Sequence, residues 1–325
     1  MHDKNIFIRV IAFSSDLENQ KSLTDSLKVM EKSMGYKSYI AKDIFAPTLF
    51  CANTDEYRLN SLVETINDTT FQVIWCLRGG YGSARIFTKL DELVEELKQC
   101  PTKIFVGFSD ATAISLFLYQ KLGWNTVIHG LNYNQISDSM DGKTFAPINF
   151  NIVDQILKGA LKFIEIKDLK PLNNNARTSK EIIGKITGGN LSILQTSIGT
   201  NWEVNTTDKI LIIEDVAELP YRIDRMLEHL YQAKKLDSLK AVVFGTFHQC
   251  GDKVTDALNR IALVLENKSV PVFKTEMIGH GCYNYPFIYG SNTEIIANSE
   301  KEFTMKQEVF LSKTWLDCRD VPHEL

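Results

Sequence analysis

The stretch Lys103-Ile104-Phe105-Val106-Gly107-Phe108-Ser109-Asp110-Ala111-Thr112 decides the fold of the first half of the chain. Its apolar run ends at a glycine, and a helical pattern over Ala111–Leu122 follows, which Gly123 closes. A strand that is apolar throughout is typical of a parallel sheet covered by helices on both faces. We therefore expect Ser109 at a strand-to-helix junction, at the carboxyl edge of the sheet, where open α/β sheets bind ligands.

The same alternation of buried strands and helices extends outward from this junction. The expected strands are Ile6–Ala12, Phe71–Leu77, Lys103–Phe108, Glu181–Ile186, Lys209–Ile213, Ala241–Phe247, Thr293–Ala297 and Glu302–Lys306. The expected helices are Lys21–Met34, Asp91–Gln99, Ala111–Leu122, Tyr221–Lys235 and Val254–Glu266. This order predicts an α/β protein with a doubly wound parallel sheet in its amino-terminal domain.

The length of 325 residues predicts about two domains. Residues 170–180 hold turn formers with few core candidates, so we expect a linker over 161–180. An amino-terminal α/β domain would then cover residues 1–160, and a carboxyl-terminal α/β domain would cover residues 181–325.

The composition excludes several classes of protein. Lys and Arg total 36 against 40 Asp and Glu, a net charge of −4, which gives no support to nucleic-acid binding. No window holds the roughly 18 apolar residues of a membrane span, and residues 1–13 lack the pattern of a signal peptide. The six cysteines form no Cys-x-x-Cys pair, so a metal site is not expected. We expect a cytoplasmic protein with reduced thiols.

Ser109 is the first candidate for a catalytic residue. The free N–H groups at the start of the following helix can stabilise an oxyanion beside it. The segment resembles a nucleophile elbow, although Ala111 stands where such an elbow has its second glycine. The alternative is that Ser109 only caps the helix.

A serine nucleophile needs a base, and histidine is the usual base at neutral pH. His280 follows an apolar run and lies between two glycines, which let backbone and substrate approach closely. His129 also ends an apolar run and is the competing candidate. His2 and His323 lie near the termini, and His229 falls in a predicted helix. Either candidate could instead be a hydrogen-bonded structural histidine.

Two acidic residues follow the predicted strand Lys209–Ile213. A carboxylate at that point must face a crevice or find a partner, because burial of an unpaired charge is costly. Glu214 is the candidate that would orient a catalytic histidine. The alternative for this cluster is that Asp215 and Glu218 cap the helix that begins near Pro220.

The loop Arg78-Gly79-Gly80-Tyr81-Gly82-Ser83-Ala84-Arg85 follows another buried strand. It matches neither Gly-x-Gly-x-x-Gly nor a P-loop, so a nucleotide site is the weaker interpretation. Its backbone N–H groups and an arginine could equally bind a carboxylate or an oxyanion. A second glycine turn, Gly188-Gly189-Asn190, lies in the other half of the chain.

These segments form an ordered set of motifs. The set is Arg-Gly-Gly-Tyr-Gly-Ser-x-Arg at 78–85, Gly-Phe-Ser-Asp-x-Thr at 107–112, Gly-Gly-Asn-Leu-Ser at 188–192, Gly-Thr at 199–200, Glu-Asp-Val-x-Glu at 214–218, Tyr-Arg-Ile-Asp-Arg at 221–225 and Gly-His-Gly at 279–281. It resembles the LD-carboxypeptidase family of serine peptidases, which also contains microcin-immunity peptidases. The similarity spans about residues 5–292 and implies a serine in an amino-terminal α/β domain, with glutamate and histidine in a carboxyl-terminal domain.

The resemblance implies a role for each candidate. Ser109 would be the nucleophile, His280 the base and Glu214 the carboxylate that orients the imidazole. The backbone N–H groups of Asp110 and Gly80 would form the oxyanion hole. Members of the family are commonly homodimers and use no metal or organic cofactor, so we expect the same here.

The loop at 78–85 looks like that of the murein-recycling branch, whose members hydrolyse the bond to the terminal D-alanine of murein tetrapeptides. A carboxypeptidase must bind a free terminal carboxylate, and an arginine fork is suited to that. We therefore expect Arg78, Gly79, Tyr81 and Arg85 to contact a murein peptide. The alternative is that one of the arginines only pairs with a surface acid.

Two positions depart from the family pattern. This chain has Phe13-Ser14-Ser15 where the family often has Pro-Ser-Gly, and Leu131 where it often has proline. Both positions could line the substrate pocket. Two other functions stay open: a peptidase of the same mechanism that acts on a peptidyl-nucleotide antibiotic, and a non-catalytic ligand-binding module.

Overall fold

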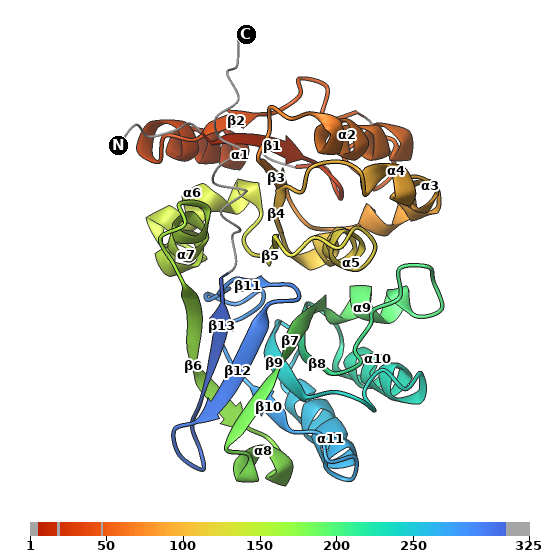
Figure 1. The fold of residues 1–325 in the computed structure, drawn as a ribbon, viewed down its shortest axis with the longest axis vertical. Coiled ribbons are helices and arrows are strands. Elements are labelled where there is room, and N and C mark those ends of the chain that lie inside the picture. The colour runs from red at the N-terminus through yellow and green to blue at the C-terminus, as the bar shows by residue number, and fades with distance from the viewer. Residues whose placement is uncertain (1–5, 18–19, 47, 310–325) are drawn as a thin grey trace. The chain divides into compact units, whose positions relative to one another are not determined.

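The chain divides into two units (Figure 1). The computed structural model describes residues 6–17, 20–46 and 48–309. The first unit ends at Ala160, and the second runs from Leu161 to Val309. Each unit is built around a β-sheet of its own.

The first unit contains a parallel sheet with the strand order β2-β1-β3-β4-β5. Its strands are β1 (Phe7–Ile11), β2 (Lys37–Tyr39), β3 (Val73–Cys76), β4 (Ile104–Gly107) and β5 (Val127–His129). Its helices are α1 (Lys21–Lys28), which continues as a π-helical turn over Val29–Ser33, α2 (Asp55–Asn67), α3 (Phe87–Glu92), α4 (Val94–Leu97), α5 (Thr112–Gln120), α6 (Ile136–Asp141) and α7 (Pro147–Leu157). The connections change direction between β1 and β3, and ligands of such sheets bind at the carboxyl ends of the strands at that point.

Helices cover both faces of this sheet (Figure 1). On one face α6 contacts both α1 and α7, and on the other α2 contacts α4. Every residue of β3 and β4 is buried, which explains why these strands are apolar throughout. The doubly wound parallel sheet that the sequence predicts is confirmed.

The second unit contains a closed barrel with the strand order β10-β6-β13-β12-β7-β8-β9. Its strands are β6 (Phe163–Pro171), β7 (Glu181–Asn190), β8 (Lys209–Val216), β9 (Ala241–His248), β10 (Val272–Lys274), β12 (Asn292–Ala297) and β13 (Phe303–Glu308), and the two-residue strand β11 (Phe287–Ile288) precedes β12 in the chain. Strands β7 to β10 are parallel neighbours, whereas β6, β12 and β13 complete the barrel with antiparallel pairs.

Four helices accompany the barrel: α8 (Asn174–Thr178), α9 (Leu191–Ser197), α10 (Pro220–Gln232) and α11 (Val254–Glu266). Helix α10 contacts both α9 and α11, and these three follow β7, β8 and β9 in turn. The α/β class predicted for this half is confirmed. Across the described residues, no helix combines the length and the apolar character needed to cross a membrane.

The predicted linker at 161–180 is wrong, because this segment contains β6 and α8. Strand β6 pairs with β10 on one side and with β13 on the other. Its residues alternate between exposed and buried along much of its length, as in a sheet with one face on the core. The turn formers that suggested a linker lie at the end of β6 and at the start of α8.

The hydrogen bonds of the Asn173 side chain hold the polar segment at residues 170–180 in place. The side chain is 1% exposed, and its Oδ1 atom accepts from the N–H groups of Ala176 at 3.0 Å and Val272 at 3.1 Å. Its Nδ2 atom donates to the carbonyls of Val270 at 2.9 Å and Ala262 at 3.2 Å. One asparagine therefore caps α8 and joins it to α11 and to the start of β10.

Asn173→Ala should lower the free energy of unfolding by about 2–4 kcal/mol, because buried backbone groups lose their partners. Urea denaturation followed by circular dichroism measures this loss. The matched control is Asn174→Ala, an exposed neighbour in the first turn of the same helix, which should change stability by no more than about 0.5 kcal/mol. Equal stability of the two variants would contradict the role of Asn173.

Candidate active site

Ser109 lies in a sharp turn between β4 and α5. Its φ angle is +64°, a left-handed conformation that residues other than glycine rarely adopt. It begins the 3₁₀ turn Ser109–Ala111, and neither this turn nor α5 has a side-chain cap. The alternative that Ser109 only caps the helix is therefore wrong. The strained turn has the backbone geometry of a nucleophile elbow.

The loop at residues 78–85, called the glycine loop below, lies directly against Ser109. A Cβ atom on Gly79 would lie 2.8 Å from both Cβ and Oγ of Ser109, so no side chain fits there. The elbow itself is equally tight, because a Cβ atom on Gly107 would lie 3.0 Å from that of Ala111. Ala111, with its single methyl group, takes the place of the second glycine of the elbow.

The side chain of Asp110 joins three segments at the elbow. Its Oδ2 atom accepts from Oγ of Ser14 at 2.6 Å and from the N–H of Ser83 at 2.8 Å, and Oγ of Ser83 donates to the Asp110 carbonyl at 2.6 Å. Burial raises the pKa of the Asp110 carboxyl, although the bonds from Ser14 and Ser83 favour its charged form. The sequence predicted a role for the amide of Asp110 and missed this structural role of its carboxylate.

Ser15 fixes the conformation of the glycine loop. Gly80 has a φ angle of +118°, and any side chain on it would collide with Oγ of Ser15. That hydroxyl accepts from the N–H of Tyr81 at 3.1 Å, so the amide of Gly80 is a better candidate oxyanion donor than that of Tyr81. The ring of Tyr81 is 54% exposed and packs edge-on against Phe50. Ser15, a departure from the family pattern, therefore contributes a bond that glycine could not make.

The structure separates the two predicted carboxylate-binding arginines. Arg85 donates through Nε and Nη2 to Oδ2 of Asp55, at 3.0 and 2.9 Å, so it pairs with a surface acid. Arg78 donates to the carbonyls of Asp16 at 2.5 Å and Gly79 at 3.1 Å, and no carboxylate among the described residues pairs with it. Arg78 is therefore the better candidate for a substrate carboxylate.

A buried arginine that sequence analysis missed supports the same loop. Arg58 of α2 is 1% exposed, and its Nη1 atom donates to the carbonyls of Phe13 and Gly82. Its Nη2 atom lies 2.5 Å from Oδ1 of Asp55. Arg58 thus links the end of β1 to the glycine loop. Its position in an ordinary amphipathic helix gives no sequence signal for this contact.

In the second unit, Glu214 and His280 form a close pair. Glu214 is fully buried in β8, at an irregularity in the pairing of β8 with β9. Its Oε2 atom lies 2.6 Å from Nδ1 of His280. This contact orients the imidazole so that Nε2 faces away from Glu214, and Nε2 is the atom that takes a proton in a serine hydrolase.

Three glycines let the backbone close around this pair. A Cβ atom on Gly279, whose φ angle is +118°, would lie 3.0 Å from Cβ of Glu214, and one on Gly245 would lie 3.2 Å from the same atom. A Cβ atom on Gly281 would lie 3.1 Å from Cγ2 of Thr246, whose hydroxyl accepts from the N–H of Gly281 at 3.2 Å. The glycines beside His280 thus serve close backbone packing, as the sequence predicted.

The pKa of His280 is raised above the ordinary value of 6.5 for histidine. Burial is the largest single effect and acts to lower the pKa. The charge and the hydrogen bond of Glu214, together with the charge of Asp215, outweigh it. The second unit therefore makes His280 more basic than a free imidazole.

Asp215 stabilises a different helix from the one expected. Its carboxylate accepts from Nδ2 of Asn190 at 3.0 Å and from both the N–H and Oγ of Ser192, at 3.0 and 2.8 Å. Ser192 lies in the first turn of α9, so the prediction that Asp215 caps α10 is wrong. Glu218, the other expected cap, pairs with Arg222 at 3.6 Å. The Asp215 carboxylate therefore binds the end of β7 and the start of α9.

His129, Phe13 and Leu131 are core residues. All three are fully buried. The ring of His129 packs edge-on against Phe108, and the carbonyl of Leu131 accepts from Nε1 of Trp75 at 2.8 Å. The prediction that Phe13 and Leu131 line the substrate pocket is wrong, because both side chains fill the interior of the first unit. The packing of His129 favours a structural role.

The candidate catalytic residues are divided between the units. Ser109 and the glycine loop belong to the first unit, and Glu214 and His280 belong to the second. Their convergence stays a prediction. His2 and His323 lie outside the described residues.

Comparison with known proteins identifies the family. The model of the LD-carboxypeptidase N-terminal domain matches residues 8–130, and that of the C-terminal domain matches residues 183–295. A Rickettsia conorii protein named as a carboxypeptidase is 41% identical over 93% of this chain and 91% of its own length. The murein tetrapeptide carboxypeptidase of Pseudomonas aeruginosa is 27% identical over 81% of this chain and 85% of its own length. The chain belongs to the LD-carboxypeptidase family, which confirms the resemblance seen in the motifs.

Solved structures of relatives share the fold. A muramoyltetrapeptide carboxypeptidase from Oxalobacter formigenes has a TM-score of 0.76 at 24% identity and covers 94% of this chain and 100% of its own. An MccF-like protein from Bacillus anthracis has a TM-score of 0.80 at 22% identity and covers 95% of this chain and 98% of its own. Both support the two-domain architecture of this chain.

NMR titration of the His280 imidazole should give a pKa above 6.5 in the wild type. Because a histidine base acts in its neutral form, a catalytic His280 should lose activity as the pH falls through this raised value. Glu214→Gln should lower the pKa, since the negative charge is removed while the ring stays buried.

Glu218→Gln is the matched control for this titration. Glu218 lies four residues further along the chain and pairs with Arg222, so its loss should leave the pKa of His280 unchanged. An unchanged pKa in Glu214→Gln would show that the pair does not set the basicity of His280.

Proposed function

We propose that this chain is a serine-type LD-carboxypeptidase that releases the terminal D-alanine of murein tetrapeptides in the cytoplasm, during peptidoglycan recycling. One observation carries the proposal: fully buried Glu214 holds His280 at 2.6 Å and makes it a stronger base. Membership of the family supports peptide hydrolysis, and the name of the Pseudomonas aeruginosa relative supports the choice of substrate.

In this proposal His280 takes the proton of Ser109 as Oγ attacks the carbonyl carbon that precedes D-alanine. The N–H groups of Asp110 and Gly80 hold the oxyanion, and Glu214 stabilises the imidazolium. His280 then protonates the leaving nitrogen, so that D-alanine departs and an acyl-enzyme remains. The same histidine activates the water that hydrolyses the ester and frees the tripeptide.

The strained turn at Ser109 argues against a non-catalytic binding module. A left-handed conformation at a residue other than glycine costs about 1–3 kcal/mol and persists at sites where strain serves the mechanism. The buried Glu214 carboxylate adds a desolvation cost that a simple binding module has no reason to bear. Both costs are understandable if Ser109 and His280 act as nucleophile and base.

We further propose that Arg78 binds the carboxylate of D-alanine, with Gly79 and Tyr81 beside it. The enzyme is proposed to act without a metal or an organic cofactor and as a homodimer, as family members commonly do. Activity in EDTA and light scattering of the purified protein test these two points.

The decisive experiment follows products by mass spectrometry after incubation with murein tri-, tetra- and pentapeptides. The tetrapeptide should lose one D-alanine, and the other two should be unchanged. Ser109→Ala and His280→Ala should each lower kcat by about 10⁴–10⁶, because the members of a triad act as a unit. Glu214→Gln should cost less. Ser33→Ala, at an exposed serine of the first unit, is the control that should retain full activity.

Two outcomes would change the proposal. Undiminished turnover by Ser109→Ala would exclude the serine mechanism. Cleavage of aspartyl sulfamoyl adenosine, the compound bound in a structure of the microcin C7 self-immunity protein MccF, without cleavage of any murein peptide would favour a peptidase for peptidyl-nucleotide antibiotics.

Arg78→Lys should weaken kcat/KM on the tetrapeptide by about 1–3 kcal/mol, because a planar fork of hydrogen bonds to the carboxylate is lost. Amidation of the terminal carboxylate should reduce hydrolysis by the wild type and remove the difference between the two proteins. Arg85→Lys is the matched control and should have little effect, because Arg85 pairs with Asp55. Equal rates on free-acid and amidated peptides would remove the carboxypeptidase assignment and leave a serine hydrolase.

A further inference from the structure

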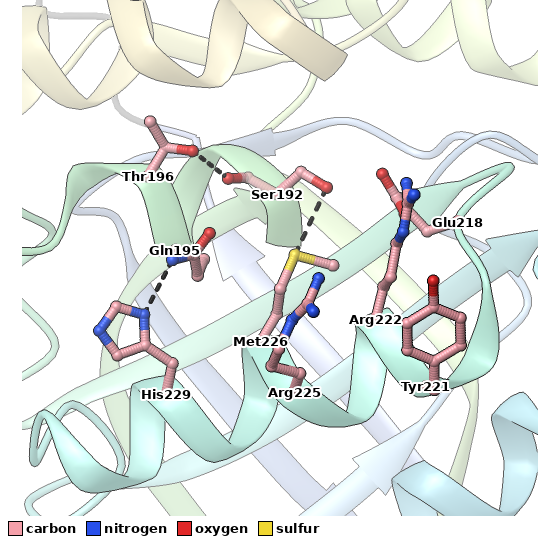
Figure 2. A pocket seen from close by; sticks show the side chains of 9 residues that line it. All are labelled: Ser192, Gln195, Thr196, Glu218, Tyr221, Arg222, Arg225, Met226 and His229. Atoms are coloured by element: carbon pink, nitrogen blue, oxygen red, sulfur yellow. Dashed lines mark hydrogen bonds and ion pairs between the residues drawn. The ribbon is translucent and has the colours of Figure 1, made fainter.

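A groove of about 590 Å³ lies between helices α9 and α10 of the second unit (Figure 2). Ser192 and Gln195 line it from α9, and Arg222 and Arg225 line it from α10. Figure 2 shows both arginines rising from α10 on the side that faces α9. The catalytic mechanism proposed above uses none of these side chains.

The groove carries an excess of positive charge. Arg225 pairs with no carboxylate among the described residues, and its guanidinium carbon lies 5.9 Å from the ring centre of Tyr221. Arg222 lies 3.6 Å from Oε2 of Glu218, a long contact for an ion pair, and its side chain is 49% exposed. Glu218 is the one acid among the described residues that line the groove.

The acids of α10 itself are directed toward α11. Asp224 and Glu228 both pair with Arg260, at 2.6 and 3.0 Å. Arg260 therefore offsets part of their negative charge, on the side of α10 that faces α11. Arg225 is left as an uncompensated cation in a concave surface, where a ligand is partly removed from water and charge pairing is stronger.

The groove also offers neutral hydrogen-bond donors. Nε2 of Gln195 lies 2.8 Å from Nδ1 of His229, and both side chains line the groove. Met226, only 8% exposed, forms the apolar floor. The groove therefore suits an anionic group attached to an organic chain. It combines the two arginine cations with ring and amide N–H groups and an apolar floor.

One end of the groove lies at the carboxyl ends of β7 and β8, and Glu214 is near the end of β8. Oγ of Ser192 donates to Asp215 at 2.8 Å, and Asp215 directly follows Glu214 in β8. Glu218 lies only four residues after Glu214. A group bound in the groove can therefore belong to the molecule that is hydrolysed rather than to a separate ligand.

We propose that this groove binds a second carboxylate of the peptide substrate, distinct from the one on the departing D-alanine, with Arg225 as its principal partner. This inference rests on the function proposed above. Murein tetrapeptides that contain diaminopimelate have two such groups, one on D-glutamate and one on diaminopimelate. An arginine fork matches a carboxylate by two parallel hydrogen bonds, and Arg222 adds a second positive charge.

The test is calorimetric binding of three peptides to the Ser109→Ala protein, which should bind them without turnover. The peptides are the diaminopimelate tetrapeptide, the same peptide amidated on D-glutamate, and the same peptide amidated on the diaminopimelate side chain. Arg225→Gln, which keeps the hydrogen-bonding amide but removes the charge, should weaken binding of the unmodified peptide by about 5- to 20-fold. One of the two amidated peptides should bind the Ser109→Ala protein more weakly than the unmodified peptide does, by a similar factor. Adding Arg225→Gln should not weaken the binding of that amidated peptide any further.

The amidated peptide that behaves in this way identifies which carboxylate the groove binds. Arg177→Gln, at an exposed arginine of α8, is the matched control and should bind all three peptides as the parent protein does. If Arg225→Gln weakens the binding of all three peptides equally, or of none, the inference is overturned. Release of D-alanine by the wild type would still leave the proposed function intact. If the wild type cleaves no murein peptide and the Ser109→Ala protein binds none, both proposals fail.

Discussion

The buried carboxylate of Asp110 is the interaction on which the rest of the first unit's site depends. It accepts hydrogen bonds from Ser14, after β1, and from Ser83, in the glycine loop, while its own backbone continues from Ser109. A buried charge without partners would cost several kcal/mol, so the three segments are held together strongly. The left-handed turn at Ser109 persists because the surrounding contacts leave the chain no relaxed alternative.

The second unit uses the same construction around Glu214. Asp215, the next residue, is buried and binds Asn190 and Ser192, so it fixes β8 to the end of β7 and the start of α9. In both units, an acidic residue directly after the candidate catalytic residue serves as an internal anchor. This explains why Asp110 and Asp215 stand in the motifs although neither carboxylate has a place in the proposed chemistry.

Local patterns in the sequence were enough to find the main candidates. An apolar strand that ends in Gly-Phe-Ser located Ser109, and flanking glycines located His280, because each signal lies within a few residues. The roles of Asp110 and Asn173 escaped prediction, since Ser14 and Val272 lie 96 and 99 residues away from them in the chain. The sequence did not predict closure of the barrel for the same reason, because the paired strands β6 and β10 are far apart in the chain.

The Glu214–His280 pair is complete within the second unit, and this has a consequence for how the family can evolve. The basicity of the histidine is inherited with the barrel, because Glu214, Asp215 and the surrounding glycines all belong to it. Substitutions in the glycine loop of the first unit therefore need no compensating change around His280. With His280 as the base, as proposed, one lineage can acquire new substrates without rebuilding the residues that make this histidine basic.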